Sequence, residues 1–388
     1  MIMRTVAVAL ITGALGAGAI GAAVKMTPAP ATLSADHDWE KSRPGPDSGR
    51  VAILIDALGR TDPVVCELIA DQLGNFWWGG GRNGVGRLAA ASATVQMAKD
   101  SVGGTITDTR AINRLIAELD GPNACTRRVA AKLLGNSAIT TARLNSLLSD
   151  GSANIRESAA LAAGNGEHKD VLPALQRALD DRSPAVVAMA AWALGEIEDK
   201  STTPALLKLV RADDGKVRLA AVWALGQIED RRAAESLERA LSADADARVR
   251  AEAAEALGEI ESSSSAPALG RALSDADITV RRAAAEAIGN LDEVRTAPPG
   301  LVQALSASDA ELRYRAAKAL TEIRDPATTS ALIGILSSPD AELRKDAVEA
   351  LGDIGSADAV QAITRALTDR DPEVRKAAAE ALGDLKDS

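Results

Sequence analysis

The sequence of 388 residues predicts an all-α fold, an α-solenoid (superhelix) of stacked antiparallel helix pairs with a period of about 31 residues. First, a Leu-Gly pair or a close variant recurs at steps of 31 or 32 residues from Leu134 to Leu382, with one shorter step of 29. Second, apolar residues within each repeat fall at helical spacing. Third, only 2% of the residues are aromatic and Ala dominates the repeats, which suits thin helix pairs and not one large core.

The last complete repeat explains where each second helix is expected to begin and end. Asp371 is placed to cap the helix N-terminus, with Pro372 at the first helical position. Gly383 follows the last core residue, where we expect a left-handed C-terminal cap. The partner helix at 357–367 is also amphipathic, and two helices of this length bury their apolar faces only by stacking on further copies. The apolar face of the second helix consists of Val374, Ala377, Ala378, Ala381 and Leu382.

We expect the array of helix pairs to cover residues 110–388. Turns between repeats are short and rich in Asp, Ser and Gly. Pro298 and Pro299 are expected to shift the start of one first helix. The first helices of the pairs are expected near 110–119, 140–149, 169–180, 201–211, 232–242, 264–274, 295–306, 327–338 and 357–368.

Three segments are expected before the array. Residues 1–25 contain an apolar run from Val6 to Val24 that Lys25 closes, which indicates a secretory signal peptide or a weak membrane anchor. Either interpretation implies export to the periplasm or cell envelope, with membrane contact only through the possible anchor. Residues 26–50 are rich in Pro, Ser and Asp and are expected to form a disordered linker. Residues 51–109 are expected to form a divergent helical cap.

The segment from Phe76 to Gly86 fits no repeat. Its glycines suggest a phosphate-binding loop, but it lacks the Gly-Lys-Ser/Thr ending and no strand is predicted before it. We therefore expect a loop between helices whose aromatic residues cover the end of the array. The sequence leaves the role of this loop open.

Two cysteines, Cys66 and Cys125, lie in corresponding helices of two early helix pairs. In an exported protein, an isolated pair of cysteines suggests a disulfide. The alternative is that both are small buried core residues, since free Cys is often buried. The sequence does not decide between the two.

Composition and charge exclude several classes of function. The formal net charge of −10 and the pI near 5.0 argue against a nucleic-acid partner. Two histidines, His37 and His168, are too few for a His-rich metal site. The many Asp and Glu residues are expected at helix caps and on solvated faces. We therefore predict no catalytic residues, no metal site and no cofactor.

Asp and Arg form two columns at the repeat period, and each Asp stands four residues before an Arg. The structural interpretation is a ladder in which each Arg meets acidic groups of its own and neighbouring repeats. The functional alternative is an anion-binding stripe. Val187 interrupts the Arg column. The column pairs are Asp214 and Arg218, Asp246 and Arg250, Asp277 and Arg281, Asp309 and Arg313, Asp340 and Arg344, and Asp371 and Arg375.

These repeats resemble the HEAT-like repeats named after phycobilisome lyases. The second helix of that family reads roughly D-x-x-V-R-x-x-A-A-x-A-L-G-x-I, and this sequence matches it at 371–385, 277–291 and 246–260, and at 340–354 with Leu343 in place of Val. The resemblance covers about residues 110–388. It implies a solenoid whose second helices line the concave, partner-facing side. It also implies variable positions two, three and six residues after the Val.

These variable positions predict a partner-binding surface. Five repeats carry a charged residue at the six-after position, whereas Leu161, Trp192 and Trp223 are apolar there. Clustered exposed apolar groups, Trp above all, mark interaction surfaces. The alternative is that the two Trp pack on each other and on the N-terminal helices. The predicted surface consists of Leu161, Met189, Trp192, Leu219 and Trp223, followed by Arg282, Tyr314, Arg315 and Lys318.

The sequence thus favours a non-enzymatic scaffold that holds a protein or peptide partner on the concave face of an exported solenoid. The alternative that the resemblance implies is a bilin lyase-like enzyme acting on a tetrapyrrole or its apoprotein. No His, Cys or acid cluster stands at the spacing of a catalytic site, which weighs against it. A third possibility is a purely structural role at the membrane, with residues 1–25 as the anchor. The sequence does not name the partner.

Overall fold

The computed structural model describes residues 48–59, 105–291 and 294–387. Two compact units make up the chain, and the boundary between them falls inside helix α11, after Ala193. Unit 1 contains α2 (Ser48–Gly59), α6 (Thr109–Glu118), α7 (Ala124–Gly135), α8 (Thr141–Leu148), α9 (Ala153–Asn165), η1 (Lys169–Val171), α10 (Leu172–Ala178) and most of α11 (Pro184–Ile197).

Unit 2 contains the repeats from Leu194 onwards. Its elements are η2 (Lys200–Thr202), α12 (Thr203–Leu209), α13 (Gly215–Ile228), η3 (Arg231–Ala233), α14 (Ala234–Ala243), α15 (Ala247–Glu259), η4 (Ser263–Ser265), α16 (Ala266–Ala272), α17 (Ile278–Asn290), α18 (Pro299–Ala304), α19 (Ala310–Ile323), η5 (Pro326–Thr328), α20 (Thr329–Ile335), α21 (Ala341–Ile354), α22 (Ala357–Ala366) and α23 (Pro372–Asp387).

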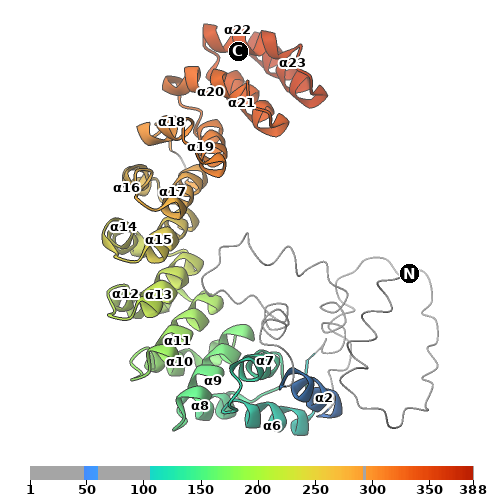
Figure 1. Cartoon of the computed structure of the whole chain (residues 1–388), viewed down its shortest axis with the longest axis vertical. Helices are drawn as coiled ribbons and strands as arrows, with labels where there is room; N and C mark the ends of the chain where they lie inside the picture. The colour runs from blue at the N-terminus through green and yellow to red at the C-terminus, as the bar shows by residue number, and fades with distance from the viewer. Residues whose placement is uncertain (1–47, 60–104, 292–293, 388) are drawn as a thin grey trace, which may run out of the picture. The chain divides into compact units, whose positions relative to one another are not determined.

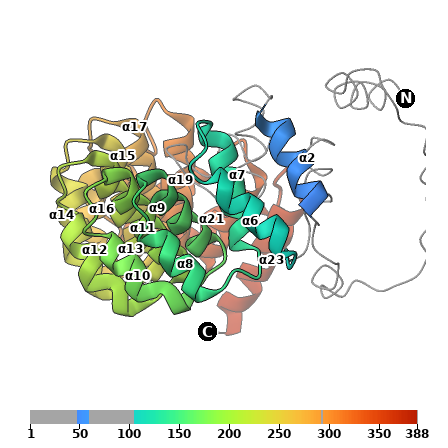
Figure 2. The same ribbon diagram turned by 90° about the horizontal axis from the view of Figure 1, so that it is seen from below.

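Helix pairs stack in each unit as the period predicts. In unit 2 the first helices α12, α14 and α16 form one column, and the second helices α13, α15 and α17 form the column beside it (Figure 1). From α13 to α21, each second helix packs on its own first helix and on the second helix of the next repeat. Figure 2 shows the same separation end-on, with α12 and α14 on one side of α13 and α15. The all-α solenoid of helix pairs is confirmed.

The second helices begin where the sequence predicts. Asp214, Asp246, Asp277, Asp309 and Asp340 each cap a second helix by accepting a backbone N–H of its first turn. Asp371 does the same for Glu373, and α23 begins at Pro372. A carboxylate at this position satisfies donors that have no partner inside the helix and interacts favourably with the helix dipole.

The first helices also lie where expected, with one further feature. Five of those in the described residues, from α10 to α20, are preceded by a one-turn 3₁₀ helix that includes the first residues of the expected span. Helix α18 begins only at Pro299, with Pro298 as its N-cap, because Pro lacks the N–H that an earlier start would require. The expected start at 295 was therefore four residues too early.

The expected glycine caps are wrong. Every Leu-Gly glycine of the described repeats, Gly383 included, lies within its helix. The left-handed residue that ends a helix stands three positions later, as at Glu229 (φ 51°) and Gly355 (φ 63°). The glycine is needed for packing, because a Cβ on Gly258 would lie 2.9 Å from Cα of Ala287 in the next repeat. The same close approach recurs at Gly164, Gly195 and Gly226, and a Cβ on Gly352 would lie 2.9 Å from Cβ of Ala381.

Three of the six column arginines, Arg218, Arg250 and Arg344, form a ladder between repeats, but their partner is not the capping Asp. The other three, Arg281, Arg313 and Arg375, donate to carbonyls of their own repeats. Nε and Nη2 of Arg344 donate to the carboxylate of Asp369 at 2.9 and 2.7 Å. Asp369 stands two residues before the cap of the next second helix and also accepts the N–H of Asp371 at 2.8 Å. Nη1 of Arg344 donates to carbonyls of its own repeat, at 2.9 Å for Ser338. Equivalent pairs are Arg156 with Asp181, Arg218 with Asp244, and Arg250 with Asp275.

The N-terminal predictions fall largely outside the described residues. The signal or anchor segment 1–25, most of the linker 26–50, the Phe76–Gly86 loop and Cys66 all lie there. The helix expected from Val51 is present as α2 and begins at Ser48, so residues 48–50 belong to it and not to the linker. Cys125, at the start of α7, is disulfide-bonded, and its pairing with Cys66 stays a prediction. None of the helices in the described ranges has the length and apolar character that a membrane span requires.

Candidate partner-binding surface

The second helices of unit 2 present a row of charged side chains at the six-after position. All five of these side chains are exposed, as the resemblance implies: Glu255, Glu286, Lys318, Glu349 and Glu380. They come from α15, α17, α19, α21 and α23 in turn. We call the exposed side of these five helices the second-helix face.

The apolar part of the predicted surface is not exposed. Leu161, Met189, Trp192 and Leu219 are all buried, with Trp192 only 6% exposed, and Trp223 is half-buried. The prediction of an accessible apolar patch at these positions is therefore wrong for four of its five members. These residues belong to the packing between repeats, as far as the described chain shows.

The glycine of the preceding repeat explains how the two indole rings pack. A Cβ on Gly164 would lie 2.7 Å from Cζ3 of Trp192, and a Cβ on Gly195 would lie 2.7 Å from Cζ3 of Trp223. Each indole thus lies over the backbone notch that a glycine opens in the helix before it. A position that is solvated when it carries Glu becomes a packing position when it carries a large apolar ring facing such a notch.

The polar part of the predicted surface does come together. Tyr314 on α19 is 39% exposed, one of four exposed large hydrophobic side chains among the described residues. Its neighbour Arg315 pairs with Glu286 of α17 and donates to Glu311 of its own helix at 2.8 Å. We call Tyr314, Arg315, Lys318 and Glu286, together with Arg282 of α17, the Tyr314 cluster.

Ion pairs fix the orientation of the two arginines of this cluster. Arg282 donates from Nε to Oδ1 of Asp309 at 2.9 Å and from Nη2 to the other oxygen. The pairing with Arg282 lowers the pKa of Asp309 to about 2, aided by the N–H of Leu312. Asp309 therefore stays ionised at neutral pH, and the guanidinium of Arg282 stays directed at it.

Sequence reasoning missed the acidic partners of this cluster. Glu311 stands four residues before Arg315 on one helix, a spacing that predicts an ion pair and could have been read from the sequence. Glu286 pairs with Arg315 of the neighbouring repeat, and this contact becomes visible only once α17 is seen to stack on α19. The cluster thus combines charges of both signs with one exposed aromatic side chain.

Among the described residues, no group of three or more His, Cys, Asp and Glu is placed to hold a metal ion. Nε2 of His168 lies 3.1 Å from the carbonyl oxygen of Gly135, a contact that joins two repeats. The arrangement of the second-helix face suits recognition by charge and by one aromatic anchor.

The family comparison agrees with this geometry. The family model described as HEAT repeats matches residues 112–191, 171–258, 239–299 and 298–383. The chain belongs to the HEAT-repeat family. A search of curated proteins found no match.

Three solved structures are similar to this chain. An engineered protein is 23% identical with a TM-score of 0.51, and the match covers 87% of this chain and 99% of that one. Importin beta is 16% identical with a TM-score of 0.52, over 88% of this chain and 52% of that one. The complex of CpcE and CpcF of phycocyanin lyase from Nostoc sp. is 21% identical with a TM-score of 0.38, over 64% and 95%. At identities this low, the engineered protein and importin beta show the fold alone.

Proposed function

We propose that this chain is a non-enzymatic scaffold that binds a protein or peptide on the second-helix face of unit 2. HEAT-repeat solenoids offer extended surfaces of helices on which polypeptides bind. The observation that carries the proposal is the Tyr314 cluster, where an exposed tyrosine lies among arginine, lysine and glutamate side chains on adjacent second helices. Tyr and Arg are the residue types that most often dominate the binding energy of an interface.

The charge pattern of the face indicates the kind of partner. Lys318 stands in the middle of the row, with Glu255 and Glu286 before it and Glu349 and Glu380 after it, so the row is mainly acidic with one basic position. A polypeptide whose basic side chains meet the glutamates and whose acidic side chain meets Lys318 complements such a row. The net charge of −10 makes a nucleic acid a poor complement.

Site-specific crosslinking tests the proposed face. A photoactivatable residue in place of Lys318 on α19 should capture a partner, whereas the same residue in place of the exposed Lys208 on α12, a first helix, should not. Tyr314→Ala should weaken binding of the captured partner about tenfold or more, as loss of a hot-spot residue does. Val302→Ala is the matched control, because Val302 is a similarly exposed apolar residue on the first helix α18. Equal capture from both lysine positions, or full binding by Tyr314→Ala, would rule out this face.

The proposal includes export, which rests on the apolar run from Val6 to Val24. Cell fractionation should place the protein in the envelope or periplasm. N-terminal sequencing of the mature chain then separates the two forms of the proposal. A start near Ala31 indicates a cleaved signal peptide, and an intact N-terminus indicates an anchor. A chain found in the cytoplasm contradicts export.

A further inference from the structure

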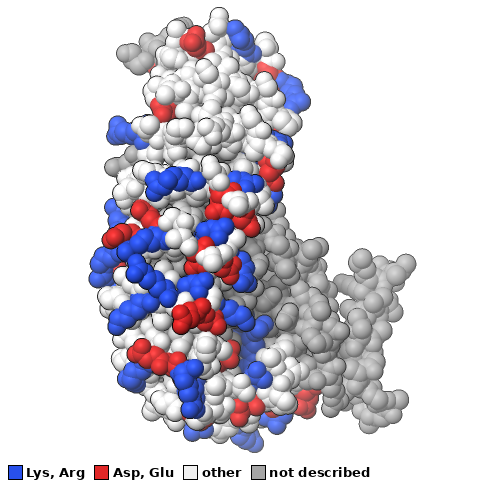
Figure 3. Space-filling view, turned by 60° about the vertical axis from the view of Figure 1, so that its left-hand side comes forward, with Lys and Arg blue, Asp and Glu red and all other residues white. Residues whose placement is uncertain are grey.

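A pocket opens in unit 2 on the side of the first helices, away from the second-helix face. It has a volume of about 330 Å³ and lies between α12 and α14, with the start of α13 as its floor. This is near the lower end of ligand pockets, which span roughly 300 to 1,000 Å³. The view in Figure 3 brings the column of first helices forward, and many of the charged side chains on it are Lys and Arg.

Positive charge dominates the lining of the pocket, although the chain as a whole is acidic. Three arginines line it, Arg211, Arg218 and Arg239, against a single carboxylate, that of Asp244. A concave site with an excess of one sign of charge concentrates ligands of the opposite sign. The excess here is two positive charges.

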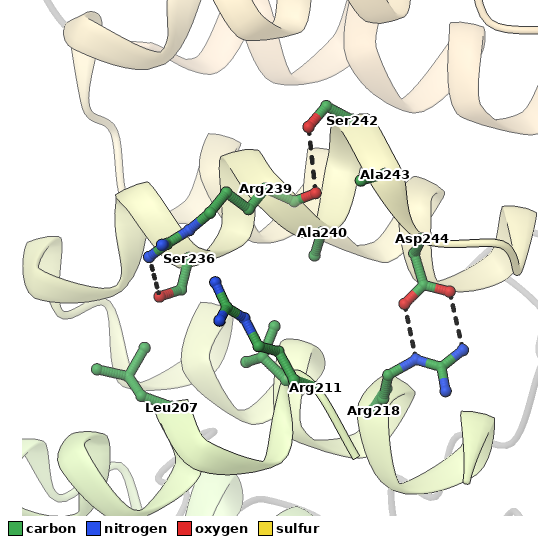
Figure 4. A pocket seen from close by; sticks show the side chains of 10 residues that line it. Leu207, Arg211, Arg218, Ser236, Arg239, Ala240, Ser242, Ala243 and Asp244 are labelled. Carbon is green, nitrogen blue, oxygen red and sulfur yellow. Dashed lines mark hydrogen bonds and ion pairs between the residues drawn. The ribbon is translucent and has the colours of Figure 1, made fainter. Parts of the chain in front are cut away.

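The three arginines differ in how far their guanidinium groups are already hydrogen-bonded within the protein. Arg218 is occupied, because its Nε and Nη2 donate to Asp244 at 2.7 and 2.9 Å and its Nη1 donates to the carbonyl of Ala212 at 2.9 Å. Arg218 therefore forms part of the lining, and we do not count it as a donor to a ligand. Arg211 has no ion pair or side-chain hydrogen bond within the described part of the chain, and its guanidinium points into the space between α12 and α14 (Figure 4).

Arg239 is partly engaged and holds a serine in place. Its Nη2 donates to Oγ of Ser236 at 3.2 Å (Figure 4), and its Nε donates to the carbonyl of Glu235 at 3.2 Å. Because Ser236 accepts this bond, its own O–H is left to donate into the pocket. Oε1 of Glu235 lies 3.6 Å from Nη2 of Arg239. The Glu235 side chain is 83% exposed, so water screens much of its charge.

From this geometry we propose that the pocket binds a small dianion, with the charge on one phosphate group or on two carboxylates. Arg211 supplies the main charged donor, Arg239 the second charge, and Ser236 a neutral O–H. The remaining lining of Leu207, Val210, Ala240 and Ala243 accommodates a short aliphatic body. Guanidinium groups suit this ligand because their planar forks match the oxygen pairs of phosphate and carboxylate.

Isothermal titration of the full chain tests this proposal with three probes at matched ionic strength. Inorganic phosphate and succinate represent the two forms of dianion, and acetate represents a single carboxylate. We expect one site for at least one dianion, and binding of acetate about tenfold weaker, because it leaves one guanidinium without a partner. The tighter of phosphate and succinate identifies the form of the ligand.

Variants locate the site. Arg211→Gln and Arg239→Gln should each weaken binding of the dianion about tenfold, the effect of losing one charged hydrogen bond. Arg271→Gln is the matched control, because Arg271 is exposed on the next first helix, α16, and does not line the pocket. Circular dichroism checks that each variant is folded, and Arg239→Gln provides a second test should Arg211→Gln not fold.

Three results would overturn the proposal. The first is that neither dianion binds. The second is that acetate binds as well as the dianions, which would show no preference for two charges. The third is that Arg271→Gln weakens binding as much as Arg211→Gln, which would show a diffuse charge effect. None of these results bears on the second-helix face, so this site and the proposed scaffold function are tested independently.

Discussion

A single methyl group decides how closely neighbouring repeats approach. Gly costs about 1 kcal/mol relative to Ala inside a helix, yet it recurs in the second helices at the same position. At Gly226 an added Cβ would lie 3.0 Å from Cα of Ala256, and at Gly258 it would lie 2.9 Å from Cα of Ala287. The backbone of the next helix occupies the space that a side chain would need. The residue is therefore determined by packing between repeats and not by the end of its own helix.

Replacing this glycine should destabilise the array wherever a further repeat covers it. Gly258→Ala places a methyl group against backbone that cannot rotate away, so we expect a loss of about 1 to 3 kcal/mol in the free energy of unfolding. Gly383→Ala is the control, because in the described part of the chain no atom beyond its neighbours and its own helix backbone lies within 4 Å of the added Cβ. There the higher helix propensity of Ala should give a gain of up to about 1 kcal/mol. Urea unfolding measures both, and a change of the same sign in the two variants would contradict the packing argument.

Backbone strain at the helix ends gives a second test at the scale of one residue. Glu229 ends α13 with φ 51°, in the left-handed region that costs a residue with a Cβ about 1 kcal/mol. Its side chain is exposed, so little packing is lost with it. Glu229→Gly should raise the free energy of unfolding by about 0.5 to 1 kcal/mol. Gly355→Ala, at the equivalent position after α21, should lower it by a similar amount, and thermal unfolding of the pair decides the point.

Between elements, the Arg–Asp pairs join one repeat to the next. Arg344 of α21 is 3% exposed, and its fork is satisfied by Asp369 on one edge and by two carbonyls of its own repeat on the other. Removing one partner from such a buried pair leaves a charge without compensation. The pair is therefore costly to break, whatever its net contribution to stability.

Two variants test these pairs, one by removing an Arg–Asp pair and the other by adding one. Asp369→Asn should lower the free energy of unfolding by about 3 kcal/mol, because the fork of Arg344 loses its carboxylate. Ser338 stands at the equivalent position one repeat earlier and accepts the N–H of Asp340 at 3.2 Å, as Asp369 accepts that of Asp371. Ser338→Asp should supply Arg313 with the missing partner and gain up to about 1 kcal/mol. Urea unfolding at low and high salt checks both, and no loss in Asp369→Asn would mean that the pair contributes nothing.

The elements also show which features a sequence reveals. The period, the capping Asp residues and Pro372 were predictable because each acts within its own helix. The role of the Leu-Gly glycine was not, because its constraint comes from the next helix along the stack. The burial of Trp192 could not be predicted either, because the space that receives its ring is opened by Gly164 of α9, in the preceding repeat. Of the predicted surface, the charged positions beside Tyr314 were found because charge at a repeating position is normally solvated.

Across the whole molecule, paired carboxylates link stability to acidity. Pairing with Arg156, Arg250 and Arg344 lowers the pKa of Asp181, Asp275 and Asp369, respectively. Arg232 lowers the pKa of Asp230 to about 2, and Arg282 does the same for Asp309. A carboxyl whose pKa is lower in the folded state than in the unfolded state stabilises the fold above the ordinary value near 3.8. That contribution is lost as the pH falls through the folded value. Asp346 acts in the opposite direction, because burial raises its pKa.

The free energy of unfolding should therefore change little between about pH 5 and 7.5, where the carboxyls with a lowered pKa are ionised in both states. It should then fall steeply from about pH 4 to 2, because the unfolded chain binds protons at a higher pH than the folded chain. Urea midpoints measured across this range test the expectation. Asp369→Asn should flatten the acid limb, since one of the lowered carboxyls is gone, whereas Asp346→Asn should raise stability at neutral pH by removing a charge that burial disfavours. If the acid limb of Asp369→Asn matched that of the unmodified chain, the ladder would not be what couples this protein's stability to pH.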